Sequence, residues 1–264
     1  MLLRWTKISA LVALLGLVSC KSTVPEFELV EIEPKIVLSF ELVNEGETID
    51  IGDAFKDQEG YNLALRTFKF YVSNIELISA GGAIENLSSV ELVDFNDNED
   101  GGNNMFTQSY NYVIPKGDYT NLRFSVGLPS NLNATDPTTV ENDNPLSTLS
   151  GMYWDWGSMY VFIMMEAGID TTGDAAPDAN IAFHTGLDTL FRQEQNYPMT
   201  FEIPAFAKDS LHIQIDWNKL FNVEGETYID LSTKPYFHAN TGLEALDMTR
   251  KFTDNFIHAI RVTP

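Results

Sequence analysis

Apolar and polar residues alternate in several short segments beyond residue 35, which is the pattern of β-strands that bury one face. Strict period two runs through two sets of positions: Leu122, Phe124, Val126 and Leu128, and then Leu211, Ile213, Ile215 and Trp217. Segments 36–40 and 90–95 are short and apolar, and they predict two further strands. Segment 160–165 is continuously apolar and predicts a central strand covered on both faces.

One longer segment, 65–78, changes phase part of the way along. Its apolar positions shift from the set of Phe68, Phe70 and Val72 to the set of Ile75 and Leu77. A change of phase within a strand indicates a β-bulge or bend, here near Asn74.

A late segment has helical rather than strand periodicity, because Leu246, Phe252, Phe256 and Ile260 fit one face of a helix. Many short strands, turn residues and long polar loops predict an all-β fold, an immunoglobulin-like or Greek-key β-sandwich with a short C-terminal helix. We find no internal repeat.

The N-terminus has the pattern of an export signal. Arg4 and Lys7 precede an apolar run, 8–18, that is too short to span a bilayer as a stable helix. Small residues then lead to Cys20. We therefore expect a signal peptide over 1–19, a tether over 20–34 and a β-sandwich domain over 35–264, with no second membrane-spanning segment.

Cys20 is the only cysteine in the chain, so it cannot form an internal disulfide. The sequence Leu17-Val18-Ser19-Cys20 resembles the lipobox of bacterial lipoproteins, in which the thiol is acylated and becomes the first mature residue. Two or three acyl chains on one cysteine suffice for stable anchoring. The expectation is a lipid-anchored protein of the bacterial cell envelope, on the periplasmic or surface side of the outer membrane; the alternative is an ordinary secretory signal.

The charge excludes one class of partner. The chain carries 38 acidic and 16 basic residues, a net charge of −22. Such a surface repels nucleic acid and anionic lipid headgroups, so we expect no nucleic-acid partner.

Five short motifs occur in one order along the chain: FKFYVSNI at 68–75, LVD at 92–94, FSVG at 124–127, GMYWDWGSMY at 151–160 and FHTG at 183–186. In this order and spacing they resemble the MbnP-like (methanobactin-associated) family of copper-binding β-sandwich proteins. The resemblance covers the chain from about Ile36 to at least Gly186.

The resemblance implies a function and a set of residues. It implies copper bound with histidine ligands, and a tryptophan oxidised to kynurenine by a partner di-haem cytochrome c peroxidase. The WxW pair is Trp154 and Trp156, and His184 matches the FHxG histidine. We expect at least one indole within reach of His184, at one end of the sandwich. A histidine of the family's first strand is replaced by Leu42, so we expect weaker copper binding than in relatives that have both.

The remaining histidines are weighed by their surroundings. His238, like His184, follows a phenylalanine near a strand–loop junction, and these two are the candidate copper ligands. His212 falls on the polar face of a strand and His258 in the late helix. From the residues alone, a structural role is the alternative for His184 and His238. The two tryptophans can likewise be core residues. The methionines Met152, Met159, Met164 and Met165 are interpreted as core filling.

Two acidic loops suggest calcium, because oxygen ligands recur at short intervals: Asn96, Asn98 and Asp100 in one loop, and Asp170, Asp174 and Asp178 in the other. The first loop has Thr107 where a calcium loop ends in glutamate. A solvated loop is the alternative interpretation of both.

No GxSxG, HExxH, phosphate-binding or haem-attachment motif occurs, and we expect a protein that is not an enzyme. Three functions stay open: an MbnP-like copper-binding lipoprotein that is a substrate of the peroxidase, a surface binding or adhesion sandwich that has lost the metal, and a calcium-stabilised scaffold.

Overall fold

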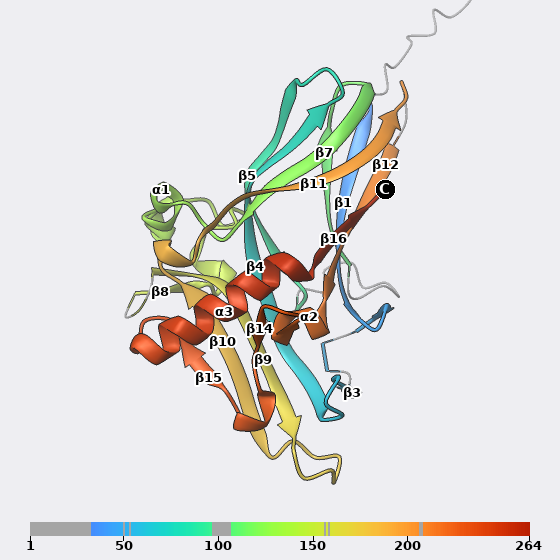
Figure 1. Ribbon diagram of the computed structural model, residues 1–264. Helices are drawn as coiled ribbons and strands as arrows, with labels where there is room; N and C mark the ends of the chain where they lie inside the picture. The colour runs from blue at the N-terminus through green and yellow to red at the C-terminus, as the bar shows by residue number, and fades with distance from the viewer. Residues whose placement is uncertain are drawn as a thin grey trace, which may run out of the picture. The chain divides into compact units, whose positions relative to one another are not determined.

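Two β-sheets and a late helix account for most of the folded chain in the computed structural model (Figure 1). The structure describes residues 33–49, 51–52, 54–96, 107–155, 157, 159–205 and 208–264. The expected signal peptide, Cys20 and most of the expected tether lie outside these ranges. Residues Ile32–Pro264 form one compact unit. Within the described part of the chain, no helix is both long and apolar enough to cross a membrane.

The smaller sheet has five strands among the described residues: β1 (Lys35–Asn44), β2 (Glu47–Thr48), β6 (Thr107–Val113), β12 (Lys208–Asp216) and β16 (Ile260–Thr263). The larger sheet has nine: β3 (Ala54–Lys56), β4 (Asn62–Ser79), β5 (Ile84–Asp94), β7 (Gly117–Val126), β8 (Tyr153–Trp154), β9 (Met159–Asp170), β10 (Ala179–Gly186), β11 (Arg192–Ile203) and β15 (Tyr236–His238). The remaining elements are the β13–β14 hairpin (Asn222–Val223 and Thr227–Tyr228) and the helices α1 (Ser130–Asn133), α2 (Trp217–Phe221) and α3 (Leu243–Ala259).

The order of the larger sheet is β11-β7-β4-β9-β10-β15, which places β9 in its interior and confirms the expected central strand. Most neighbours are antiparallel, but β10 and β15 run parallel, as do β1 and β12 of the smaller sheet. The all-β sandwich with a C-terminal helix is therefore confirmed.

The main core lies between the two sheets. Phe40 of β1 contacts Phe70 of β4 and Phe124 of β7 edge to face, with ring centroids 6.0 and 6.3 Å apart. Phe252 and Phe256 of α3 extend this core, and Phe252 stacks on Phe183 of β10 at 4.5 Å. Such aromatic pairs add stability beyond the area they bury.

A second apolar cluster covers the other face of the larger sheet. Its members include Tyr71 of β4, Phe162 and Met164 of β9, and Leu146 and Met152 of the segment between α1 and β8. Because both faces of β9 are covered, its residues stay buried at odd and even positions alike, as the continuous apolar run predicts.

The bulge expected near Asn74 is present. Asn74 has a positive φ of 51°, and the register of β4 with β5 shifts just after it. Two boundaries were predicted wrongly. Trp217 begins α2 instead of ending β12, because the Asp216 side chain caps the helix by accepting a hydrogen bond from the Asn218 N–H. Ile260 begins β16, one residue after α3 ends.

Candidate metal centre

His184 lies on the face of the larger sheet that points away from the main core. Successive residues of a strand face opposite sides, so Phe183 packs against α3 and His184 points into the second cluster's side of the sheet. The His184 residue is only 4% exposed. The site therefore lies on the face of the larger sheet opposite the main core, and its expected position at one end of the sandwich stays a prediction.

His238 is brought to His184 by the parallel pairing of β15 with β10, in which the two residues are direct register partners. Their Nδ1 atoms lie 3.1 Å apart. The backbone fixes this position, because the Ala239 N–H donates to the His184 carbonyl and the Thr241 N–H donates to the His238 carbonyl. Both sequence-predicted copper ligands thus meet in one site.

Trp154 completes an aromatic cluster with the two histidines. Its ring centroid lies 4.8 Å from that of His184, in an edge-to-face arrangement, and 5.4 Å from that of His238. The β8–β9 hairpin places it there, with Trp154 opposite Met159. The expectation that an indole lies within reach of His184 is confirmed for Trp154, whereas Trp156 lies outside the described residues.

Burial keeps both histidines neutral. Desolvation, with a smaller contribution from the nearby His238, lowers the pKa of His184 to about 3. Burial also lowers the pKa of His238, while the Glu166 carboxylate opposes that shift. Protons therefore do not compete for these nitrogens near neutral pH, and neutral imidazole is the form that binds metal.

Glu166 of β9 approaches the far side of the His184 ring. Its Oε1 lies 2.9 Å from His184 Nε2. Nε2 is itself buried and makes no well-aligned hydrogen bond. Because His184 is neutral, this contact joins a carboxylate to a neutral imidazole and is not an ion pair.

The register of β9 with β10 brings one methionine thioether close to the histidine pair. Met164 of β9 is the direct cross-strand partner of His184. Direct partners have Cβ atoms about 4.5–5.5 Å apart on one face of the sheet. Among the described residues, no three His, Cys, Asp or Glu side chains are arranged to hold a metal. The Met164 thioether is a potential soft donor on the same face of the sheet as His184. Sequence reasoning assigned Met164 to core and gave no role in the site to Glu166.

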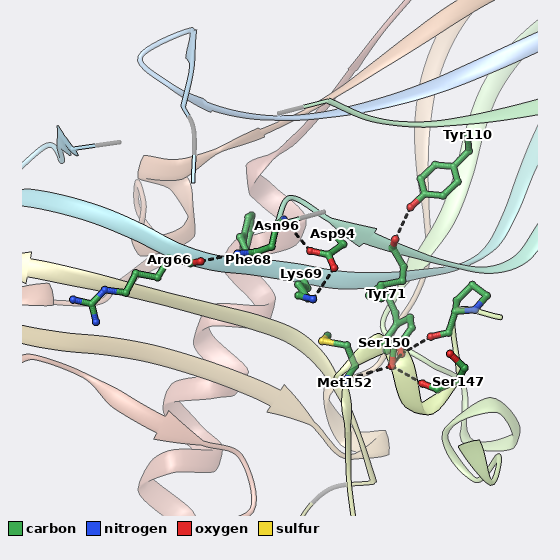
Figure 2. Close-up of polar contacts among 12 residues, drawn as sticks. Arg66, Phe68, Lys69, Tyr71, Asp94, Asn96, Tyr110, Ser147, Ser150 and Met152 are labelled. Atoms are coloured by element: carbon green, nitrogen blue, oxygen red, sulfur yellow. Dashed lines mark hydrogen bonds and ion pairs between the residues drawn. The ribbon is translucent and has the colours of Figure 1, made fainter. Parts of the chain in front are cut away.

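Buried tyrosines hold the segment that leads to Trp154 against the sheet. The Tyr71 hydroxyl donates to the Pro145 carbonyl at 2.9 Å, and the Tyr160 hydroxyl donates to the Leu146 carbonyl at 2.6 Å. Figure 2 shows how Ser150 then ties this segment together: its hydroxyl donates to the Ser147 carbonyl and accepts from the Met152 N–H. The hydrogen bonds fix the start of β8 and hence Trp154.

The other histidines lie elsewhere. His212 is about half exposed and contacts Glu41 across the strands of the smaller sheet, and His258 pairs with Glu226 on the surface. Leu42, where the resemblance led us to expect a histidine, is buried in the main core. That core is on the opposite side of the larger sheet from His184.

The predicted calcium residues are engaged in local hydrogen bonds where the structure describes them. Both oxygens of Asp170 accept from its loop and from Asn62, and Asp178 accepts from Thr171 and pairs with Lys234 at 2.9 Å. Asp174 accepts from the Ala176 N–H. Asn96 bridges Phe68 N–H and the Arg66 carbonyl (Figure 2). Asn98 and Asp100 lie outside the described residues, and calcium binding stays a prediction.

Comparison with known proteins gives one family. A family model described as MbnP matches residues 33–240. Among solved structures, MbnP from Methylosinus trichosporium is similar, with 19% sequence identity over 73% of this chain and 80% of that chain and a TM-score of 0.46. A search of curated proteins finds no match.

Proposed function

We propose, because the chain belongs to the MbnP family, that it is a copper-binding protein of the bacterial cell envelope. In this proposal His184 and His238 hold the ion, and Trp154 is the residue that a partner di-haem cytochrome c peroxidase oxidises. The protein is itself no enzyme, and a lipid on Cys20 anchors it.

The observation that carries the proposal is the pair of neutral imidazoles. Two nitrogen–metal bonds of about 2 Å can span the 3.1 Å between the Nδ1 atoms of His184 and His238. Imidazole and thioether donors suit copper, and a soft sulfur favours Cu(I). Met164, opposite His184, is the thioether that the register brings nearest to this histidine.

The position of Trp154 supports its role as the oxidised residue. Its ring contacts both imidazoles. An indole N–H only donates hydrogen bonds. In the proposed oxidation, peroxide used by the peroxidase supplies two oxygen atoms that cleave the five-membered ring to N-formylkynurenine, and two peroxide molecules are reduced to water. Hydrolysis then releases the formyl carbon as formate and leaves kynurenine, whose amine and carbonyl have lone pairs. The modified residue then offers the site donor groups that tryptophan lacks.

The proposal is tested by Cu(I) titration against a competing chelator, with protein purified from its own host. We expect one copper per chain and at least a tenfold loss of affinity in His184→Ala and in His238→Ala. His212→Ala is the matched control, because that histidine lies on the other sheet and is half exposed. Equal affinity in all four proteins would remove the copper assignment to this histidine pair and leave the binding or adhesion sandwich and the calcium-stabilised scaffold as the open functions.

Peptide mass spectrometry tests the partner. We expect kynurenine at Trp154 in protein made together with the peroxidase, and unmodified tryptophan when the peroxidase is deleted. Trp154→Phe should bind copper as weakly as the protein made without the peroxidase. Kynurenine at Trp156 alone would contradict the assignment.

A further inference from the structure

Glu166 places a carboxylate against the histidine pair, and it touches the ring nitrogen of His184 that faces away from His238. The contact, 2.9 Å from Oε1 to Nε2 of His184, is made while Nδ1 of the same ring faces His238. Among the described residues, no Lys or Arg pairs with Glu166. Its negative charge is therefore directed at His184 without a competing cation.

A neutral imidazole carries one proton, on either Nδ1 or Nε2. A carboxylate beside Nε2 stabilises an N–H there and repels a lone pair there, so the proton stays on Nε2 and the lone pair on Nδ1. The angle of this contact is not that of an ideal hydrogen bond. The preference for the Nε2–H tautomer is therefore set by the negative charge of Glu166 at short range and not by a strong hydrogen bond.

The sheet holds Glu166 in this position. Glu166 pairs with Ala182, and Met164 pairs with His184, in the antiparallel β9–β10 ladder. Residues two apart on a strand share a face, so Glu166, Met164 and His184 all lie on one side of the sheet. The side chain of Glu166 is 38% exposed, whereas that of His184 is 3% exposed. The carboxylate thus lies at the solvent-exposed edge of the buried site.

We propose that Glu166 is a positioning residue that keeps His184 in the Nε2–H form and so directs its Nδ1 lone pair toward the site shared with His238. The direction of the lone pair toward a shared metal rests on the proposed copper function. The Nε2–H tautomer of His184 has a consequence in the metal-free protein as well: His238 carries its proton on Nδ1 and donates it to His184 Nδ1 across the 3.1 Å contact.

The test is imidazole ¹⁵N NMR of the metal-free protein, which reads the protonated nitrogen of each histidine directly. We expect Nε2–H for His184 and Nδ1–H for His238. Glu166→Ala should shift His184 toward the Nδ1–H form, and Glu166→Gln should shift it in the same direction but by less, because the amide oxygen keeps only a partial negative charge beside Nε2. Glu226→Gln, which removes the carboxylate beside His258, is the matched control and should leave His184 unchanged.

Copper affinity provides the second measurement. Loss of such an outer carboxylate typically lowers metal affinity 10–100-fold, so we expect a drop of that size in Glu166→Ala and a smaller one in Glu166→Gln. An Nδ1–H His184 in the parent protein, or a tautomer indifferent to Glu166→Ala, would overturn the positioning role. Failure of the parent to bind copper would instead overturn the proposed function, since the tautomer is read without metal.

Discussion

Gly127 occupies a backbone position that a larger residue does not fit. Its φ is +90°, and a Cβ built there would come within 2.7 Å of the Phe162 ring. Its N–H donates to the Tyr71 carbonyl, and its carbonyl accepts from the Ser73 hydroxyl. The glycine of the FSVG motif is thus explained by close packing between β4, β7 and the central strand β9.

Gly127→Ala is expected to destabilise the domain by about 2–5 kcal/mol, from the cost of positive φ and from overpacking against Phe162. Gly82→Ala is the matched control, because Gly82 has a φ of +83° but nothing within 4 Å of its Cβ position. The control should lose about 1–2 kcal/mol. Denaturant unfolding measures both, and equal losses would show that the Phe162 contact is unimportant.

Single residues of the site could be selected from the sequence, but their contacts could not. His184 and His238 were chosen by elimination and by motif. That they meet depends on the parallel pairing of β10 with β15, whose register no local pattern encodes. Local sequence also could not separate Trp154 from Trp156; the β8–β9 hairpin places Trp154 against His184, and Trp156 lies outside the described residues.

At the scale of elements, the sequence predicts strands well where one face is buried and poorly where a cap intervenes. The bulge at Asn74 follows from a change of apolar phase that the register of β4 reproduces. Trp217 continues the strand's alternation, yet Asp216 caps a helix at that point. Local hydrogen bonding by an aspartate side chain decided the element there, against the hydrophobic pattern.

The loop after β9 is organised by Asp170. Its Oδ1 accepts from the N–H groups of Thr172 and Gly173, and its Oδ2 accepts from Ala175 N–H and the Asn62 amide. These bonds, that of Asn62 first, hold the pKa of Asp170 well below its ordinary value. A lowered pKa means that the carboxylate stabilises the folded state above the ordinary value near 4, and that this stability is lost as the pH falls below it.

Asp170→Asn is therefore expected to lower the melting temperature at pH 7, since an amide NH₂ would face N–H donors in place of one oxygen. The difference between parent and variant should shrink steadily as the pH falls from 4 to 2, because Asp170 of the unfolded parent is protonated there and the carboxylate's contribution to folding is lost. Thermal melts across this range measure it. Asp174→Asn, whose carboxylate accepts one loop N–H, is the control and should show little change at any pH. A difference independent of pH would contradict this account of the loop.

The whole molecule is arranged around a sheet that is buried on both sides. One side packs against the smaller sheet and α3, while the other is covered by the second cluster, on whose side the histidines lie. Motif residues Tyr71, Gly127 and Tyr160 support the second side, so the motifs mark the packing around the candidate site as much as its histidines. The replacement at Leu42 falls in the main core and leaves the His184–His238 pair complete.

The last prediction concerns the whole chain and its anchor. The proposed anchor, Cys20, precedes the described domain, which begins at residue 33, and the proposed copper ligands all lie within that domain. Anchoring and copper binding should then separate. Cys20→Ser should abolish labelling by radioactive fatty acid and move the protein from the membrane fraction to the precursor or soluble fraction, because without acyl chains the apolar attachment is lost. Its copper affinity, measured beside that of the parent, should change less than twofold, and His184→Ala should give the reverse result: full acylation with weakened copper binding. A Cys20→Ser protein that still fractionates with membranes would show that something other than the lipid attaches it, and the lipoprotein assignment would fail while the copper site stood.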